Sequence, residues 1–217
     1  MKILMLVVLS LFLQACSFTA PSYQAADANK KILVNTIKKL AVVHEKSSVD
    51  DESSIMCRTA GSVSLPGGMP FSEYLLNALK DELKAADKLD EKGEKLFVKL
   101  MRISFTTAGS TNWYIDASYR IADKNITIAT VYNDRSSFAA ISACNNVARY
   151  FSKAVETHLS QLFNDPVFQT VTGYSGGKSQ SETNVVDKLR QLDQLRQEGL
   201  ISEADYIRKK KELIDAM

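Results

Sequence analysis

The stretch Asn112–Ile121, NWYIDASYRI, alternates apolar and polar side chains along its whole length. Successive side chains of a β-strand point to opposite faces, so this pattern predicts a strand with one buried face. Apolar segments lie on both sides of it, KLFVKLMRISF at 95–105 and ITIATVYN at 126–133, separated from it by short polar turns. The three segments predict an antiparallel meander with one face in the core.

Two helices are predicted around this meander. Apolar residues recur every three or four positions from Phe71 to about Asp87, and again from about Phe138 to Phe163. Pro166 then ends the second helix, because the residue before a proline disfavours helical geometry. Shorter strands are expected near 38–46 and around Cys57. The predicted fold class is α+β: a two-layer sandwich of two helices on one side of an antiparallel sheet.

The N-terminus reads MKILMLVVLSLFLQAC. Lys2 supplies a positive start, and residues 3–13 form an apolar run of about eleven residues. A run of this length is typical of a secretory signal and is shorter than the roughly 20 residues that span a bilayer.

The end of this signal, LQAC at 13–16, resembles the bacterial lipobox. The resemblance implies a signal peptide over 1–15 and acyl chains, palmitate among them, on Cys16. In enterobacteria an Asp after that cysteine resembles an inner-membrane retention signal, so Ser17 favours the periplasmic face of the outer membrane. Without lipidation the protein would be secreted and soluble. Residues 16–30 are polar and small, and they are expected to be a tether before a periplasmic domain at 31–172.

The chain has three cysteines. If Cys16 carries the anchor, then Cys57 and Cys144 can pair in the oxidising periplasm. Such a disulfide would stabilise the fold by about 4 kcal/mol in the chain-entropy model. Buried free thiols are the alternative. Shared metal ligation is disfavoured, since Cys144 and His158 lie about 21 Å apart along one predicted helix.

The C-terminal part begins with a Gly/Ser linker at 173–183, followed by two amphipathic stretches at 184–217. Gly199 separates the stretches, and Ser202 with Asp205 is typical of a helix capping box. This part resembles the bacterial SHOCT (short C-terminal) domain, which implies a helical hairpin that mediates oligomerisation or interaction. The residues expected to make that contact are Leu189, Leu192, Leu195, Ile201 and Tyr206.

The middle of the chain resembles a group of poorly characterised Gram-negative lipoproteins. The similar segments are CRTAGSVSLPGGMPFSEYLLNALKDEL at 57–83, NWYIDASY at 112–119 and ACNNVARYFSKAV at 143–155. The order of elements is also similar to the outer-membrane lipoprotein of the lipopolysaccharide assembly machine and to auxiliary transport lipoproteins. That second likeness concerns the fold and implies little about function.

Enzyme motifs are weak. Gly173–Gly177 fits G-x-S-x-G around Ser175, yet a polar linker follows where a helix is required, and both histidines precede the serine. The acids at 50–52 lack the spacing of a calcium loop. With 27 basic and 25 acidic residues, the chain has no strong field for nucleic acid.

These observations predict a non-enzymatic, lipid-anchored interaction protein without a cofactor or metal, which serves envelope assembly or transport. Its expected partners are the membrane, through Cys16, and a protein or a second copy, through the C-terminal hairpin. A lipid- or glycan-binding lipoprotein with a pocket between sheet and helices is the alternative. An envelope serine hydrolase acting through Ser175 is a third reading.

Overall fold

The structure is a computed structural model that describes residues 17–107, 110–134, 139–175, 192, 196, 202 and 205–210. The chain divides into two compact units, 1–175 and 176–217, and each is described by itself.

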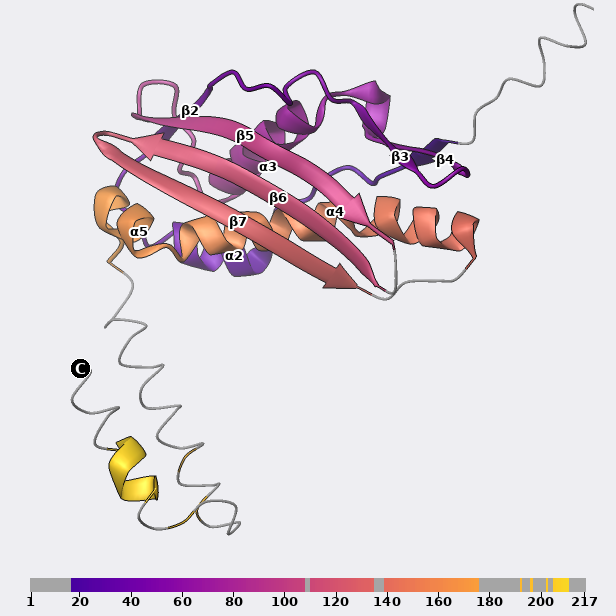
Figure 1. Cartoon of the computed structure of the whole chain (residues 1–217). Helices are drawn as coiled ribbons and strands as arrows, with labels where there is room; N and C mark the ends of the chain where they lie inside the picture. The colour runs from indigo at the N-terminus through magenta and orange to yellow at the C-terminus, as the bar shows by residue number, and fades with distance from the viewer. Residues whose placement is uncertain are drawn as a thin grey trace, which may run out of the picture. The chain divides into compact units, whose positions relative to one another are not determined.

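A four-stranded sheet forms the centre of the first unit, in the order β2-β5-β6-β7 (Figure 1). Its strands are β2 (Leu40–His44), β5 (Glu94–Thr106), β6 (Thr111–Ile121) and β7 (Lys124–Asp134). The predicted meander is confirmed, because β6 pairs antiparallel with both β5 and β7. A bulge between Leu100 and Arg102 shifts the register of β5 and returns Ile103 to the buried face.

Helices α3 (Phe71–Ala85) and α4 (Ala140–Phe163) lie on the same face of this sheet, behind it in Figure 1. Helix α3 contacts β2 and β5, whereas α4 contacts β6 and β7. Trp113 of β6 is fully buried between them, with its ring centroid 4.6 Å from that of Phe151. Its indole N–H donates to the Val147 carbonyl at 2.9 Å, so the polar edge of the ring is satisfied inside the core.

The first unit also contains a second, three-stranded sheet, in the order β1-β4-β3. Strand β3 (Ser54–Cys57) turns back within three residues into β4 (Gly61–Ser64). Strand β1 (Ser17–Thr19) adds to the other side of β4 in parallel, and its Phe18 is buried. Helix α4 also contacts β1 and β4, so this one helix joins the two sheets.

The predicted two-layer sandwich of two helices on one antiparallel sheet, with a C-terminal helical hairpin, is therefore wrong. The described residues form two sheets, and both sheets are mixed, because β2 pairs in parallel with β5 and β1 pairs in parallel with β4. Two further helices pack on the first unit, α2 (Asp27–Leu33) and α5 (Pro166–Thr172), and a 3-10 turn lies at Pro66–Gly68. Pro166 ends the long helix as predicted but also starts α5, whose first amides are capped by Asp165.

The segment expected to be a tether is folded onto this unit. It supplies β1, Phe18 and the start of α2. The reason is one buried carboxylate on α3: Glu82 Oε1 accepts hydrogen bonds from the Tyr23 hydroxyl, from the Ala26 amide at 3.1 Å and from Asn29 Nδ2 at 2.8 Å. A buried carboxyl group needs hydrogen-bond donors, and in this chain the N-terminal segment provides them.

In the second unit, residues Asp205–Lys210 are helical. The predicted cap is present, because the Asp205 amide donates to Ser202 Oγ at 3.1 Å. Tyr206 is buried within this unit, with the Arg196 guanidinium 4.4 Å from its ring centroid. Leu192 is helical and half-buried, whereas Leu189, Leu195 and Ile201 lie outside the described residues.

Candidate interaction surface

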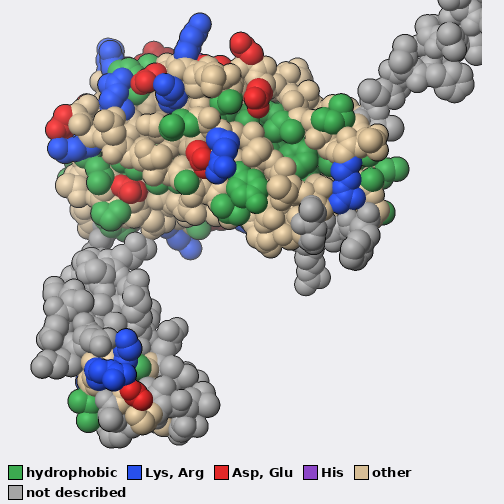
Figure 2. Space-filling view, in the orientation of Figure 1, with side chains coloured by type: hydrophobic (Ala, Val, Ile, Leu, Met, Phe, Trp, Pro, Cys, Tyr) green, Lys and Arg blue, Asp and Glu red, His purple; other side chains and the backbone are tan. Residues whose placement is uncertain are grey.

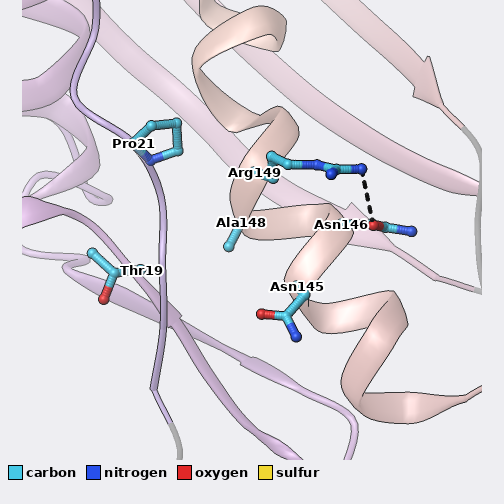
Figure 3. Close-up of a pocket in the computed structure, with 6 residues that line it drawn as sticks. All are labelled: Thr19, Pro21, Asn145, Asn146, Ala148 and Arg149. Carbon is cyan, nitrogen blue, oxygen red and sulfur yellow. Dashed lines mark hydrogen bonds between the residues drawn. The ribbon is translucent and has the colours of Figure 1, made fainter.

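The N-terminal segment and helix α4 border two neighbouring hollows on the surface of the first unit. The larger one, about 470 Å³, is lined by Thr19, Pro21, Asn145, Asn146, Ala148 and Arg149 (Figure 3). The smaller one, about 290 Å³, is lined by Pro21, Ser22, Tyr23, Gln24, Ser152 and Glu156. Together they form a polar groove along one face of α4.

The chemistry of this groove is mixed. Arg149 lies at one end, where its guanidinium contacts Asn146 and the Tyr150 hydroxyl, and Glu156 lies at the other end, bonded to Lys153. Amide, hydroxyl and charged groups of this kind suit polar ligands, and Tyr23 is the aromatic residue of the lining set. The groove is therefore a shallow polar surface and differs from the apolar pocket between sheet and helices that a buried lipid would need.

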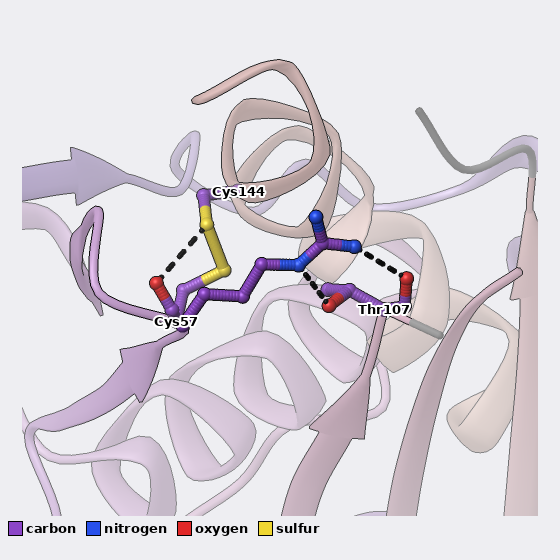
Figure 4. Close-up of a disulfide and its surroundings, with 4 residues drawn as sticks. Cys57, Thr107 and Cys144 are labelled. Atoms are coloured by element: carbon purple, nitrogen blue, oxygen red, sulfur yellow. Dashed lines mark hydrogen bonds between the residues drawn. A yellow bond between two sulfur atoms is a disulfide. The ribbon is translucent and has the colours of Figure 1, made fainter. Parts of the chain in front are cut away.

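The predicted disulfide between Cys57 and Cys144 is confirmed, with 5.9 Å between the two Cα atoms (Figure 4). It joins β3 of the small sheet to the first turns of α4, and both cysteines are fully buried. Arg58, the next residue, donates from Nε to Thr107 Oγ1 at 2.9 Å and from a terminal nitrogen to the Thr107 carbonyl. The disulfide and Arg58 thus tie the small sheet to the end of β5 as well as to α4.

The four-stranded sheet leaves its other face open to solvent, and this face carries arginines stacked on aromatic rings. Arg102 forms an ion pair with Asp116 at 2.8 Å and lies over the ring of Tyr114. Acidic and basic side chains lie beside one another on this face in Figure 2. Arginine and tyrosine are enriched in protein interfaces, and the pairing here leaves the face without a strong net charge.

A second such group lies at the β2 side of the same face. The Arg120 guanidinium lies 3.9 Å from the ring centroid of Phe97 and 3.2 Å from a carboxylate oxygen of Glu45. The sequence pattern had placed Arg120 and Tyr114 on the outward face of the strand, which the structure bears out, but it gave no sign of these ring contacts. They depend on the exact register between β5 and β6, which places Phe97 opposite Arg120.

Strand β7 forms the outer edge of this sheet. Its inner-facing Ile126, Ile128 and Thr130 are buried by α4 and α5, and no described strand pairs with its outer side. Between Lys124 and Asp134 the strand has no charged residue, proline or glycine. Proteins usually protect an exposed edge with such residues, so this strand is suited to pair with another one.

His158 is a buried positioning group for β7. The Thr130 hydroxyl donates its one proton to Gln161 Oε1, so it must accept the hydrogen bond from His158 Nδ1–H at 2.8 Å. The other ring nitrogen, Nε2, then carries no proton and accepts from the Tyr119 hydroxyl at 2.8 Å. Burial lowers the pKa of His158 to about 3. The imidazole is therefore neutral at physiological pH and holds β6 and β7 to helix α4.

The residues considered for catalysis are not assembled into a site. Ser175 donates its hydroxyl to the Asn35 carbonyl at 3.1 Å. His158 is enclosed by Tyr119 and Thr130, and His44 contacts Asp50 at 3.1 Å. Burial alone would raise the pKa of Asp50, but hydrogen bonds from Ser47 and His44 lower it, so this contact closes the 45–50 loop.

The described part of the chain contains no cluster of three or more His, Cys, Asp or Glu side chains arranged to hold a metal ion. Its helices are all too short or too polar to cross a bilayer. Cys16, the predicted lipidation site, lies outside the described residues, immediately before β1.

Comparisons with known proteins add little. No protein-family model matches the sequence, and no curated protein matches it. One similar solved structure is a crystal structure of an uncharacterized protein, with 10% identity, a TM-score of 0.38, and alignment over 67% of this chain and 97% of that one. A likeness at this level supports no argument about fold or function.

Proposed function

We propose that this protein is a non-enzymatic, lipid-anchored interaction protein on the periplasmic face of the outer membrane. The observation that carries this proposal is the position of β1, which begins at Ser17, directly after the cysteine of the lipobox-like LQAC. The proposal places the domain in envelope assembly or transport, where a protein must be held at the membrane and present a surface to partners.

The anchor would hold the domain without any tether. Phe18 and Ala20 are buried, and Ser17, Phe18 and Thr19 are paired with β4. Acyl chains on residue 16 would therefore keep the small sheet at the lipid surface, rather than let the domain move freely above it. This arrangement supports an interaction role, since the surfaces far from β1, including the large sheet, would face the periplasm.

The anchor is tested by labelling cells with a clickable palmitate analogue and then fractionating the membranes. Full-length protein should carry the label and fractionate with the outer membrane, whereas Cys16→Ala should lose the label. Ser17→Ala is the matched control and should keep it. An unlabelled wild-type protein, or equal labelling of Cys16→Ala, would contradict the proposal.

The interaction role is tested by crosslinking in intact cells. Full-length protein is compared with a chain stopped after Ser175, because the Ser175 amide still bonds to Asn35 and closes the first unit. A partner captured only by the full-length form would assign recruitment to residues 176–217, the SHOCT-like segment. A partner captured by both forms would assign it to the first unit. Hydrolysis of envelope esters that is abolished by Ser175→Ala would overturn the non-enzymatic proposal.

Lipid or glycan binding is the second candidate, and the polar groove between residues 19–24 and α4 favours a glycan. The interior between sheet and helices does not favour it, because Trp113, Phe71 and Phe151 fill that space with ring centroids 4.6–6.1 Å apart. Protection of the groove by a soluble glycan, lost in Arg149→Ala and kept in Lys153→Ala, would support this alternative.

A further inference from the structure

The edge strand β7 has a sequence that matches itself in reverse. Antiparallel pairing of two copies about Ala129 would place residue 124 opposite residue 134 of the other copy, 125 opposite 133, and so on inward to Ala129 opposite Ala129. We propose that two copies of this chain pair through β7 in this register and form one continuous eight-stranded sheet across a two-fold axis.

The charges at the two ends of the strand support this partner. Lys124 would lie opposite Asp134 of the second copy, and by symmetry the same pair would form at the other end. In the single chain Lys124 contacts the neighbouring Asp123, and Asp134 accepts a hydrogen bond from Tyr132 at 3.2 Å. Both are contacts of exposed or half-buried side chains, which can be exchanged at small cost.

The residue pairs between the two ends of β7 are also compatible with this register. On the solvent face, Asn125 would meet Asn133, Thr127 would meet Val131, and Ala129 would meet Ala129. All five of these side chains are exposed and uncharged, so none has to bury a charge on pairing. A shift of this register by two residues in either direction would remove both charge pairs, so the sequence favours one alignment.

The strand order gives β7 no described partner on its outer side. The order β2-β5-β6-β7 places β7 at the end of the sheet, and its register with β6 runs without a bulge from residue 124 to 134. Helices α4 and α5 contact β7, and α4 passes behind the sheet in Figure 1. A two-fold axis normal to the sheet keeps the helices of both copies on one side and the open faces on the other.

This inference deepens the proposed interaction role by naming the partner, and it does not depend on the lipid anchor. We expect a modest affinity, because an interface made by one pair of strands buries less surface than the interface of a permanent dimer does. Confinement of an anchored protein to a membrane would raise its local concentration, which would favour pairing.

Single cysteines on β7 test the register. Paired Cα atoms in an antiparallel sheet lie about 4.5–5.5 Å apart, which permits a disulfide. In full-length protein under mild oxidation, Ala129→Cys should form a covalent dimer. Thr127→Cys is the matched control: it lies on the same face, but the two copies of residue 127 would be about 13 Å apart along the strands and should crosslink at least ten-fold less. The double variant Thr127→Cys/Val131→Cys should crosslink again.

The outcomes separate the possibilities. Equal crosslinking at 127 and 129 would mean random collision and would overturn the proposal, as would no crosslinking at either position. A crosslink from Ala129→Cys to a different protein would also overturn it and identify another occupant of the edge. The experiment is repeated with Cys16→Ala added, which removes both the proposed anchor and the one cysteine outside the disulfide. A crosslink that persists in this variant supports pairing through β7 whether or not the anchor proposal is correct.

Charge exchange gives a second, independent measurement. Lys124→Asp should lower the dimer fraction measured by sedimentation at least ten-fold, because it places like charges opposite each other at both ends. Lys124→Asp with Asp134→Lys should restore it. A double variant that stays as monomeric as the single one, with its fold intact by circular dichroism, would contradict the proposed register.

Discussion

The two edges of the four-stranded sheet are built differently. Strand β2 has five residues, lies between charged residues at 38–39 and 45–46, and is partly covered: the Leu40 amide donates to the Lys88 carbonyl, and the Asp90 amide donates to the Leu40 carbonyl. Strand β7 has eleven residues and an uncharged stretch of nine, with no described strand beyond it. One edge is protected against pairing with another chain and the other is not.

The difference supports the proposed pairing through β7. An unprotected edge of this length promotes aggregation unless it is used, so evolution normally removes it. The protection of β2 shows that the chain can protect an edge when pairing there is not wanted. We therefore regard β7, and not β2, as the interaction edge, and the predictions below test this contrast in order of decreasing effect on the free energy of unfolding.

Loss of the disulfide is expected to lower the free energy of unfolding more than any of the other changes below. It should not alter pairing through β7. Replacing Cys57 and Cys144 together by Ser should lower the free energy of unfolding by about 4 kcal/mol, because the bond closes a long loop in the unfolded chain. Urea unfolding measures the change, with the exposed Met56→Ala as control. Crosslinking through Ala129→Cys should persist in whatever fraction stays folded. A change below 1 kcal/mol would contradict the expectation.

Acidification should lower the free energy of unfolding, because protonation of His158 disrupts its contacts with β6 and β7. The unfolded chain protonates His158 near pH 6.5, whereas the folded chain keeps it neutral down to about pH 3. This stability is therefore present above about pH 6.5 and is lost as the pH falls toward 3, at about 1.4 kcal/mol per pH unit. The expected loss at pH 4.5 relative to pH 7 is about 2.5 kcal/mol.

The His158→Gln variant isolates this effect. It should be less stable at pH 7, because it disturbs the contacts with Tyr119 and Thr130, but it should lose less stability between pH 7 and pH 4.5 than the wild type does. Urea unfolding at the two pH values measures both changes. If the two proteins lose the same amount, His158 is not the group responsible.

Gly93→Ala should damage the protected edge instead. A methyl group at this position would lie 2.5 Å from the Lys39 carbonyl oxygen and 2.8 Å from the Leu40 nitrogen, which are backbone atoms at the start of β2. We expect a loss of about 2 kcal/mol, measured by thermal unfolding, with the exposed Lys92→Ala as control. Equal stability of the two variants would show that β2 moves aside easily.

Ala129→Lys should have the smallest effect on folding and a large one on pairing. The side chain of Ala129 is exposed, so the free energy of unfolding of the monomer should change by less than about 0.5 kcal/mol. Two lysines would face each other on the two-fold axis, so dimers should disappear in sedimentation experiments. Val43→Lys, on the half-buried β2 strand, is the comparison and should leave dimerisation unchanged.

Local patterns predicted much of the structure. Alternation in 112–121 gave β6 and its buried face, and helical spacing gave α3 and α4 within a few residues of their ends. The two cysteines left after Cys16 gave the disulfide. The strand and the helices depend on residues close together in sequence. The disulfide was predicted from the number of cysteines and from the oxidising compartment expected for the protein. The same patterns could not give β1 or the parallel pairing of β2, because strands of three and five residues form only against partners about 45 to 55 residues away.

The candidate interaction surface divides in the same way. The sequence by itself determined that β7 is uncharged from 125 to 133 and has opposite charges at its ends. Only the tertiary structure decided that β7 is an edge strand, that His158 holds it to α4, and that Glu82 folds the expected tether onto the domain. The physical reason is that side-chain periodicity records which face of an element is buried, whereas strand order and buried hydrogen bonds depend on which distant segments meet when the core closes.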